Sequence, residues 1–166
     1  HRPLTPGLLD LFRIFAEVLQ SYIKREWDNK SSASHIYDSL LTDLLSGAVG
    51  SKANLEERAH HAGIPLTGPY KLLRVACSQE MQVPVGRMAQ ELSNMLPDAW
   101  VLIYQQKLVV LARVQKDLPE EERAAMDRRM LGFLERYDAY CADSMEFANL
   151  SLVADAYDKA NLALKY

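Results

Sequence analysis

Two adjacent histidines, His60 and His61, are the first residues of this 166-residue chain whose chemistry suggests a metal site. Neighbouring residues of a helix point about 100° apart, so the pair cannot bind one metal ion without ligands from elsewhere. The remaining histidines, His1 and His35, stand at no recognised ligand spacing, and the sequence has no Cys-x-x-Cys or His-x-x-x-His motif. Imidazoles near the end of a helix also interact favourably with its free carbonyl groups. The sequence therefore predicts no metal site.

The other groups that could do chemistry also lack the surroundings that catalysis requires. Cys77 and Cys141 fall in predicted strands, where a free cysteine commonly acts as a small buried hydrophobic residue. A Gly-x-Ser-x-Gly nucleophile elbow is absent. The glycines of Gly47 to Gly50 follow a helix and lack the Gly-Lys-Ser/Thr ending of a phosphate-binding loop. The carboxylates cluster at predicted helix starts and polar faces. We expect no catalytic residue and no cofactor.

Composition limits the class of protein. Hydrophobic residues make up 49% of the chain, and the net charge is −3 without a dense run of Lys or Arg. A domain that binds DNA by itself normally carries a basic face, so we expect no direct DNA contact. The apolar segment from Leu8 to Ile23 is interrupted by charged residues, which argues against a membrane span. Two cysteines fit a reducing cytoplasm. Because the chain begins at His1 without a methionine, we expect a fragment of a longer protein.

Helices are predicted over the first part of the chain. Apolar residues from Leu8 to Trp27 recur at helical spacing and form a wide face. The polar stretch from Asn29 to Ser34 is the best linker, which predicts domains at residues 1–34 and 35–166. A second helix is predicted from about His35 to Gly47. A third, short helix follows, with Asn54 as its N-cap and Gly63 just past its end.

Strands and helices alternate from Tyr70 onward. Strand-like runs are "YKLLRVAC", "AWVLIY", "LVVLARV" and, more weakly, "AYCADSM". The second and third are separated only by Gln105-Gln106-Lys107 and predict a β-hairpin. Helical patterns follow Val85, Pro119 and Asn149. The order β-α-β-β-α-β-α is typical of a mostly antiparallel sheet with helices packed against it, so the predicted fold class is α+β, preceded by an N-terminal helical segment.

Aromatic residues are the best candidates for a ligand pocket or an interface. These candidates are Trp27, Tyr70, Trp100 and Tyr104. Core and edge packing is the favoured explanation for each of them taken singly.

Two stretches of the sequence resemble the middle domain of PucR/CdaR-type bacterial transcription regulators. The first runs through Leu44-Leu45-Ser46-Gly47 and on to Pro69-Tyr70, with Leu55, Arg58-Ala59, Gly63 and Leu66 between them. The second begins at Ser144 and contains Leu150, Leu152, Ala156-Tyr157, Ala160 and Ala163-Leu164. The resemblance covers residues 37–166.

The resemblance implies a degenerate GGDEF-like fold, related in shape to nucleotide cyclases, between a sensory region and a C-terminal helix-turn-helix. DNA binding would then belong to a domain missing from this fragment. A working cyclase of this fold would have Gly-Gly-Asp/Glu-Glu-Phe at the hairpin and an aspartate just after the first strand. Here the hairpin reads Tyr104-Gln105-Gln106-Lys107, and "CSQEMQ" ends the first strand, with Glu80 as the nearest carboxylate. Two-metal chemistry needs carboxylate oxygens, which glutamine lacks.

Three hypotheses follow. The first is a non-catalytic regulatory and oligomerisation domain of a cytoplasmic bacterial transcription factor, forming a homodimer through helices. The N-terminal helix from Leu8 to Trp27 would pair with its copy in a dimer, run back toward a sensory domain, or pack on its own domain. The second is a nucleotide-binding or residual nucleotide-cyclase domain. The third is a sensor of a small-molecule effector, with a pocket between the sheet and the N-terminal helices. No membrane partner is expected.

Overall fold

The computed structural model describes residues 14, 15, 17–20, 37–78 and 85–164. The chain divides into two units, residues 1–36 and 37–166. In the first unit, residues 14–15 and 17–20 are helical, with exposed side chains. None of the helices in the described ranges is long and apolar enough to cross a membrane.

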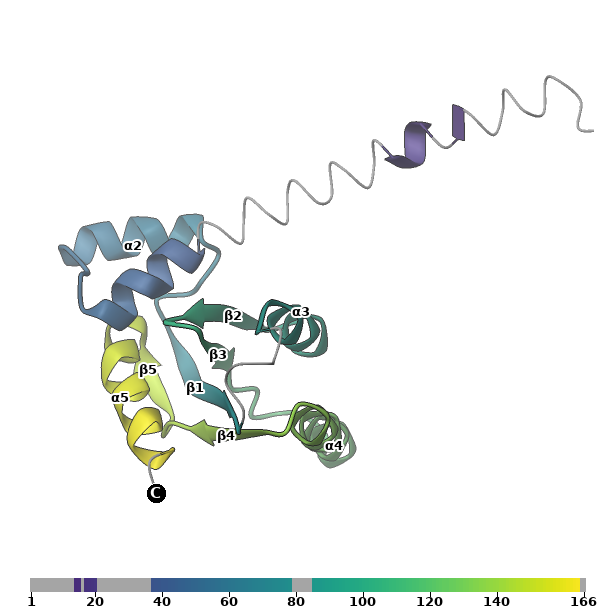
Figure 1. Cartoon of the computed structure of the whole chain (residues 1–166). Helices are drawn as coiled ribbons and strands as arrows, with labels where there is room; N and C mark the ends of the chain where they lie inside the picture. Colours follow the sequence, from purple (N-terminus) through teal and green to yellow (C-terminus); the bar gives the residue numbers. More distant parts are fainter. Residues whose placement is uncertain (1–13, 16, 21–36, 79–84, 165–166) are drawn as a thin grey trace, which may run out of the picture. The chain divides into compact units, whose positions relative to one another are not determined.

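The second unit begins with a helix over residues 37–46 and then alternates strands and helices (Figure 1). Its labelled elements, in chain order, are α2 (Lys52–His61), β1 (Thr67–Cys77), α3 (Val85–Met95), β2 (Ala99–Tyr104), β3 (Lys107–Arg113), α4 (Glu120–Arg136), β4 (Ala139–Asp143), β5 (Phe147–Asn149), the 3-10 helix η1 (Leu150–Leu152) and α5 (Val153–Ala163). The fold class is therefore α+β, as the sequence predicts.

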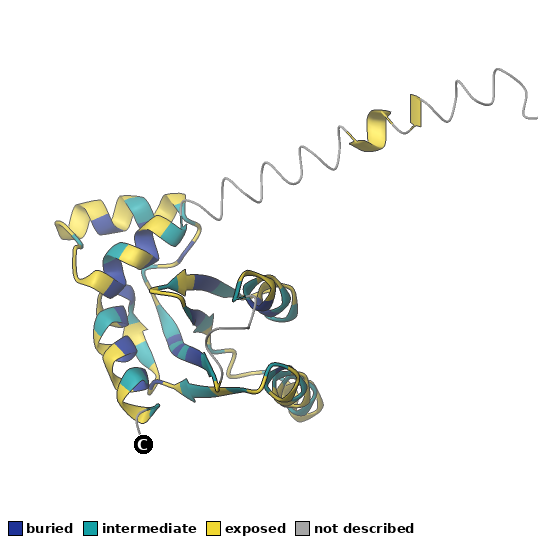
Figure 2. Ribbon diagram, viewed as in Figure 1, coloured by how far each residue is buried: buried dark blue, intermediate teal, exposed yellow. Residues whose placement is uncertain are grey.

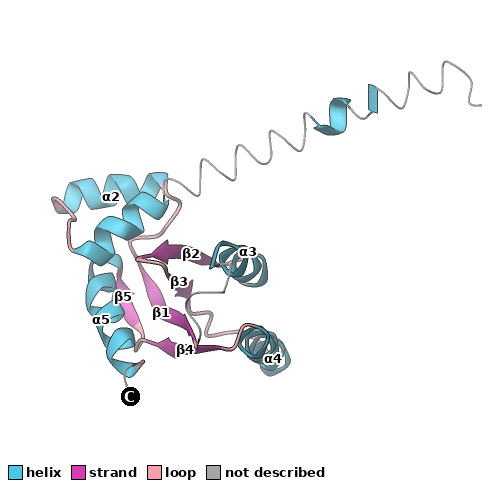
Figure 3. Cartoon of the chain, in the orientation of Figure 1, coloured by secondary structure: helices cyan, strands magenta, loops and turns pink. Residues whose placement is uncertain are grey.

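The strands form one antiparallel sheet in the order β2-β3-β1-β4, and the short β5 also pairs with β1 (Figure 3). The central strand β1 lies between β3 and β4, with Arg74 opposite Val109 on one side and Ala142 on the other. Since side chains of a strand alternate between the two faces of its sheet, this register decides which residues of β1 share a face.

Helices cover both faces of the sheet, and each face has its own core (Figure 2). Tyr70 and Leu72 of β1 pack with the helix 37–46, α2 and α5. Leu73 and Val75 of β1 point to the opposite face, where Val75 packs with Met88 of α3 and Phe133 of α4. The sheet therefore lies between two layers of helices. The end of β1 and the turn between β2 and β3 lie at the same edge of the sheet.

Local signals explain most of the element boundaries. Gly63 has a φ of +67° directly after the C-cap Ala62, as predicted for the residue past the helix end. The predicted cap Asn54 is wrong, because Ser51 caps α2 and its hydroxyl oxygen accepts a hydrogen bond from the Asn54 main-chain N–H at 3.4 Å. Serine, one turn earlier in the chain, fulfils the same role.

The predicted closing helix also begins too early. Asn149 ends strand β5, residues 150–152 form the 3-10 helix η1, and α5 starts at Val153. The Asn149 side chain accepts a hydrogen bond from the Ser151 main-chain N–H at 2.9 Å, which caps η1. Lys107, predicted as part of the hairpin loop, is the first residue of β3.

Candidate functional site

The turn between β2 and β3 contains only Gln105 and Gln106. Their φ angles are +49° and +61°, and the flanking Tyr104 and Lys107 form the last pair of the ladder. A two-residue hairpin turn with positive φ at both positions favours asparagine and glycine, because other side chains are strained in the left-handed region. Both glutamines are exposed, so the tip of the hairpin presents neutral amide groups.

The carboxyl end of β1 lies at the same edge of the sheet as this turn. Ser78 follows the strand, and its main-chain N–H and its hydroxyl group each donate a hydrogen bond of 3.0 Å to the main-chain carbonyl of Asp138. Glu80 lies outside the described residues. Serine and glutamine therefore stand at the described positions where the resemblance implies metal-binding carboxylates.

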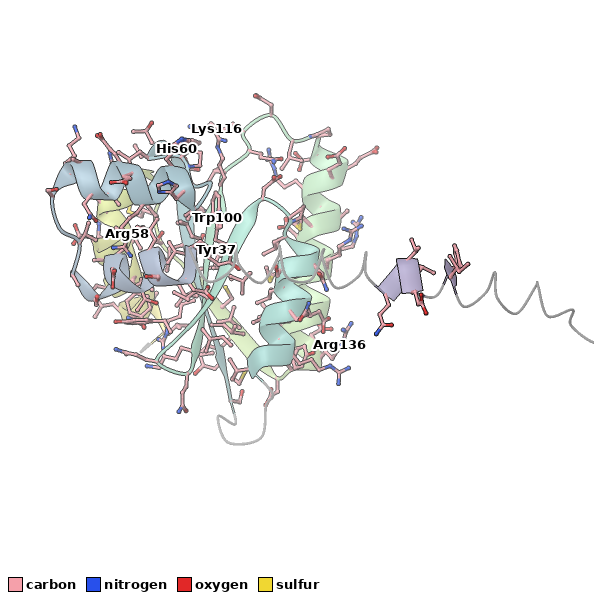
Figure 4. All side chains as sticks on the ribbon, turned by 90° about the horizontal axis from the view of Figure 1, so that it is seen from above. Tyr37, Arg58, His60, Trp100, Lys116 and Arg136 are labelled. Atoms are coloured by element: carbon pink, nitrogen blue, oxygen red, sulfur yellow. The ribbon has the colours of Figure 1, made fainter. Side chains whose placement is uncertain are left out.

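No group of three or more His, Cys, Asp or Glu side chains in the described part of the chain is arranged to hold a metal ion. The two histidines lie exposed at the end of α2, with ring centroids 6.1 Å apart, and His60 is labelled in Figure 4. Arg58 of the same helix instead contacts the helix 37–46, with an ion pair of 2.7 Å to Asp43 and a hydrogen bond of 3.2 Å to Ser39. These residues join two helices.

The two cysteines are only partly exposed. Burial raises the pKa of the Cys141 thiol to about 11, and the negative charge of Asp143 acts in the same direction. The Sγ atom of Cys77 lies 3.7 Å from Sδ of Met88 in the core beneath α3. Because the thiolate is the nucleophilic form, Cys141 is unsuited to covalent catalysis at neutral pH.

The structure brings two of the four aromatic candidates together. The rings of Tyr70 and Trp100 meet edge to face with centroids 6.4 Å apart, and Phe147 lies 5.9 Å from Tyr70. Tyr70 is fully buried, its hydroxyl group donates a hydrogen bond to the main-chain carbonyl of Pro65, and burial raises its pKa. This cluster joins β1, β2 and β5 on the face that α5 covers.

Tyr104 lies apart from that cluster, at the carboxyl end of β2. Its ring meets Tyr157 of α5 edge to face, with centroids 5.6 Å apart. Tyr104 therefore connects the strand that leads into the hairpin turn with the last helix. Trp27 lies outside the described residues.

A surface groove of about 370 Å³ opens between the helix 37–46, α2 and the start of α5. Apolar side chains, including Leu44, Leu55 and Leu66, form part of its wall, and Lys52, Asn149 and Ser151 supply polar groups. Sequence reasoning did not find these lining residues. The available signal was the Gly47–Gly50 segment, which separates two helices and contributes both glycines to the lining. A volume of this size is within the range of small-molecule sites.

Comparison with known proteins gives one family. The family model described as "GGDEF-like domain" matches residues 46–166, which is most of the chain. No curated protein and no solved structure matches the chain.

Proposed function

Because the chain belongs to the family of GGDEF-like domains, we propose that it is a non-catalytic regulatory and oligomerisation domain of a cytoplasmic bacterial transcription factor of the PucR/CdaR type. The observation that carries this proposal is the chemistry of the sheet edge. Gln105 and Gln106 form the hairpin turn, and Ser78 follows the first strand. DNA binding is assigned to a separate helix-turn-helix domain in the longer protein.

The argument against catalysis is electrostatic. Metal-assisted phosphoryl transfer needs anionic oxygen ligands that hold Mg²⁺ against a triphosphate. A glutamine amide is neutral, and the Ser78 hydroxyl already donates to Asp138. Neither position supplies the negative charge that would neutralise a divalent cation.

A nucleotide turnover assay tests this part of the proposal. The full chain is incubated with GTP or ATP and either Mg²⁺ or Mn²⁺, and cyclic products and released pyrophosphate are measured. We expect neither product, while an active nucleotide cyclase in the same assay demonstrates its sensitivity. Product formation by this chain that requires the divalent cation would overturn the non-catalytic assignment and favour the alternative of a nucleotide-cyclase-type enzyme.

The oligomerisation part is supported by the apolar side chains of the first unit. Ile14, Phe15 and Val18 are 60%, 62% and 61% exposed, and Leu19 is 41% exposed. Their spacing places an apolar stripe along the helix that a second copy would bury in a dimer.

Sedimentation equilibrium of the full chain tests the dimer. Val18→Asp should shift a dimer toward the monomer, because it places a charge within the stripe. Leu131→Asp is the matched control, since Leu131 is 59% exposed on α4 and lies in the other unit. An unmodified chain that sediments as a monomer at high micromolar concentration would contradict the dimer. Equal effects of both variants would contradict an interface through this stripe.

Effector sensing is supported by the groove between the helix 37–46, α2 and α5. A thermal-shift screen with sugar acids, purine catabolites and nucleotides should give a concentration-dependent rise in Tm for one class. Ala154→Phe would place a ring in the groove and remove that rise. Ala163→Phe, at an exposed position of the same helix, should retain it. A rise that survives Ala154→Phe would place the effector elsewhere.

A further inference from the structure

Arg74 is a buried arginine in the middle of the central strand. It is 9% exposed, with Val109 beside it on β3 and Ala142 beside it on β4. The alternation of the strand places it on the same face as Leu72, which is the face that α5 covers. An arginine at such a position is unusual, because charged residues are almost never fully buried unless they are paired.

No hydrogen bond or ion pair joins the Arg74 guanidinium to the described residues. Its Nε atom is enclosed by protein and has no hydrogen-bond partner. The terminal nitrogens are not among the enclosed atoms, so they reach the surface of the domain. A buried donor without an acceptor is strongly unfavourable, so this nitrogen points to a partner beyond the described residues.

The residues next to Arg74 are small and apolar. Ala142 is directly opposite on β4, and Ala76 is the next residue along β1 on the same face. Ala160 of α5 is fully buried, and α5 packs against both β1 and β4. None of these alanine side chains can accept a hydrogen bond from the guanidinium group of Arg74.

The charge of this face is positive near its edge. Lys107 and Tyr140 are diagonal neighbours of Arg74 on β3 and β4, about 7–8 Å away at the backbone and within reach of long side chains. Of the nearby carboxylates, Asp143 points to the opposite face, where Lys71 holds it at 2.8 Å. Asp158 on α5 is exposed and forms no ion pair with Arg74. No described carboxylate neutralises the guanidinium.

We propose that Arg74 binds an oxyanion, either a carboxylate or a phosphoryl group of a small molecule, at the edge where Lys107 and Tyr140 face the same side of the sheet. The planar guanidinium presents parallel N–H donors that match two oxygens of such a group. Lys107 adds a second positive charge and Tyr140 a hydroxyl donor. This site differs from the groove beside α2 and does not depend on what that groove binds.

Thermal unfolding of the full chain tests the proposal with inorganic phosphate and with malonate, each at constant ionic strength set with potassium chloride. A ligand present at ten times its Kd raises Tm by about 3–6 °C for a chain of this size. Arg74→Met should abolish the rise, and Arg74→Lys should weaken it at least several-fold. Arg87→Met is the control, because Arg87 is exposed on α3 on the other side of the sheet and the substitution removes the same charge.

The responses of the two anions identify the source of the oxyanion. A rise with phosphate alone indicates a phosphoryl ligand, and a rise with malonate alone indicates a carboxylate. No rise with either anion, or an equal rise in Arg74→Met, overturns the site. If Arg74→Met does not fold, an NMR titration of the unmodified chain decides. Shifts concentrated at the Ala142 and Lys107 amides support the site, and their absence overturns it.

Discussion

The hydroxyl group of Ser144 accepts a hydrogen bond from the central strand β1, at a position where a neighbouring strand would supply a main-chain carbonyl. Removing this hydroxyl group should lower the free energy of unfolding. Ser144 follows the end of β4 and is 4% exposed. Its main-chain N–H donates to the Leu72 carbonyl at 2.7 Å, and its Oγ accepts a hydrogen bond from the Leu72 main-chain N–H at 3.0 Å. The same hydroxyl donates to the Met145 carbonyl at 2.9 Å. Ser144 thus maintains the pairing of β1 where β4 ends and β5 has not begun.

In the Ser144→Ala variant, the Leu72 N–H keeps its buried position but loses its acceptor. An unsatisfied buried donor costs about 1–3 kcal/mol of stability. Ser78→Ala is the matched control, because the Ser78 hydroxyl also donates to a main-chain carbonyl beside the β1–β4 pairing but is exposed. Water can donate to the exposed Asp138 carbonyl in place of the hydroxyl group, so the control should lose less than about 1 kcal/mol.

Urea unfolding followed by circular dichroism measures both variants. Ser144→Ala should lower the midpoint without changing the slope, which shows a change in stability rather than in the unfolded state. Hydrogen exchange gives a residue-specific readout. The exchange rate of the Leu72 amide should rise in Ser144→Ala and stay the same in Ser78→Ala. If the two variants lose equal stability and the Leu72 amide stays protected, the assignment of Ser144 as its acceptor is refuted.

The other predictions concern the hairpin turn, a buried thiol and a tyrosine. Replacing Gln105 by Asn together with Gln106 by Gly should raise stability by about 1 kcal/mol, measured in urea, because both positions have positive φ; a lower midpoint would contradict the turn geometry. The Cys141 thiol, with a pKa of about 11, should be modified by iodoacetamide slowly at pH 7, with a rate that rises about tenfold per pH unit up to pH 10; fast modification at pH 7 would contradict its burial. The unfolded thiol ionises near its ordinary pKa of 9.0. The contribution of Cys141 to folding stability is therefore fully present below pH 9 and is lost as the pH rises toward 11. The hydrogen bond of 2.8 Å to Glu91 raises the pKa of Tyr137, so Glu91→Gln should lower it in an NMR titration, and an unchanged value would count against that bond.

Local patterns were sufficient to predict most of the elements. The helical spacing from Val85 predicts α3, the short loop after Tyr104 predicts the hairpin, and Gly63 predicts the end of α2, all of which the structure confirms. These signals depend on residues close together in the sequence, so they are readable without knowledge of the fold. The strand β5 was missed because its three residues gain their order from pairing with β1, which begins some eighty residues earlier.

Arg74 shows why the sequence alone could not locate the proposed anion site. In the run "YKLLRVAC", Lys71 and Arg74 are the two cations, and the strand pattern does not show that the first is paired with a carboxylate and the second is not. Lys71 has Asp143 as its partner, whereas Arg74 has Val109 and Ala142 as its neighbours. That difference depends on the register between β1 and β4, which is a property of the folded sheet.

The charges along the sheet edge together suggest how this fold can bind an anion without a metal ion. Carboxylates in a nucleotide site bind a divalent cation, and the cation then binds the phosphates. In this chain, glutamines occupy the turn and Arg74 and Lys107 lie on one face of the strands beside it. Positive side chains bind an oxyanion directly, and added carboxylates would compete with it. Gln106→Glu should therefore weaken phosphate or malonate binding rather than create a metal site, because the new negative charge stands next to Lys107.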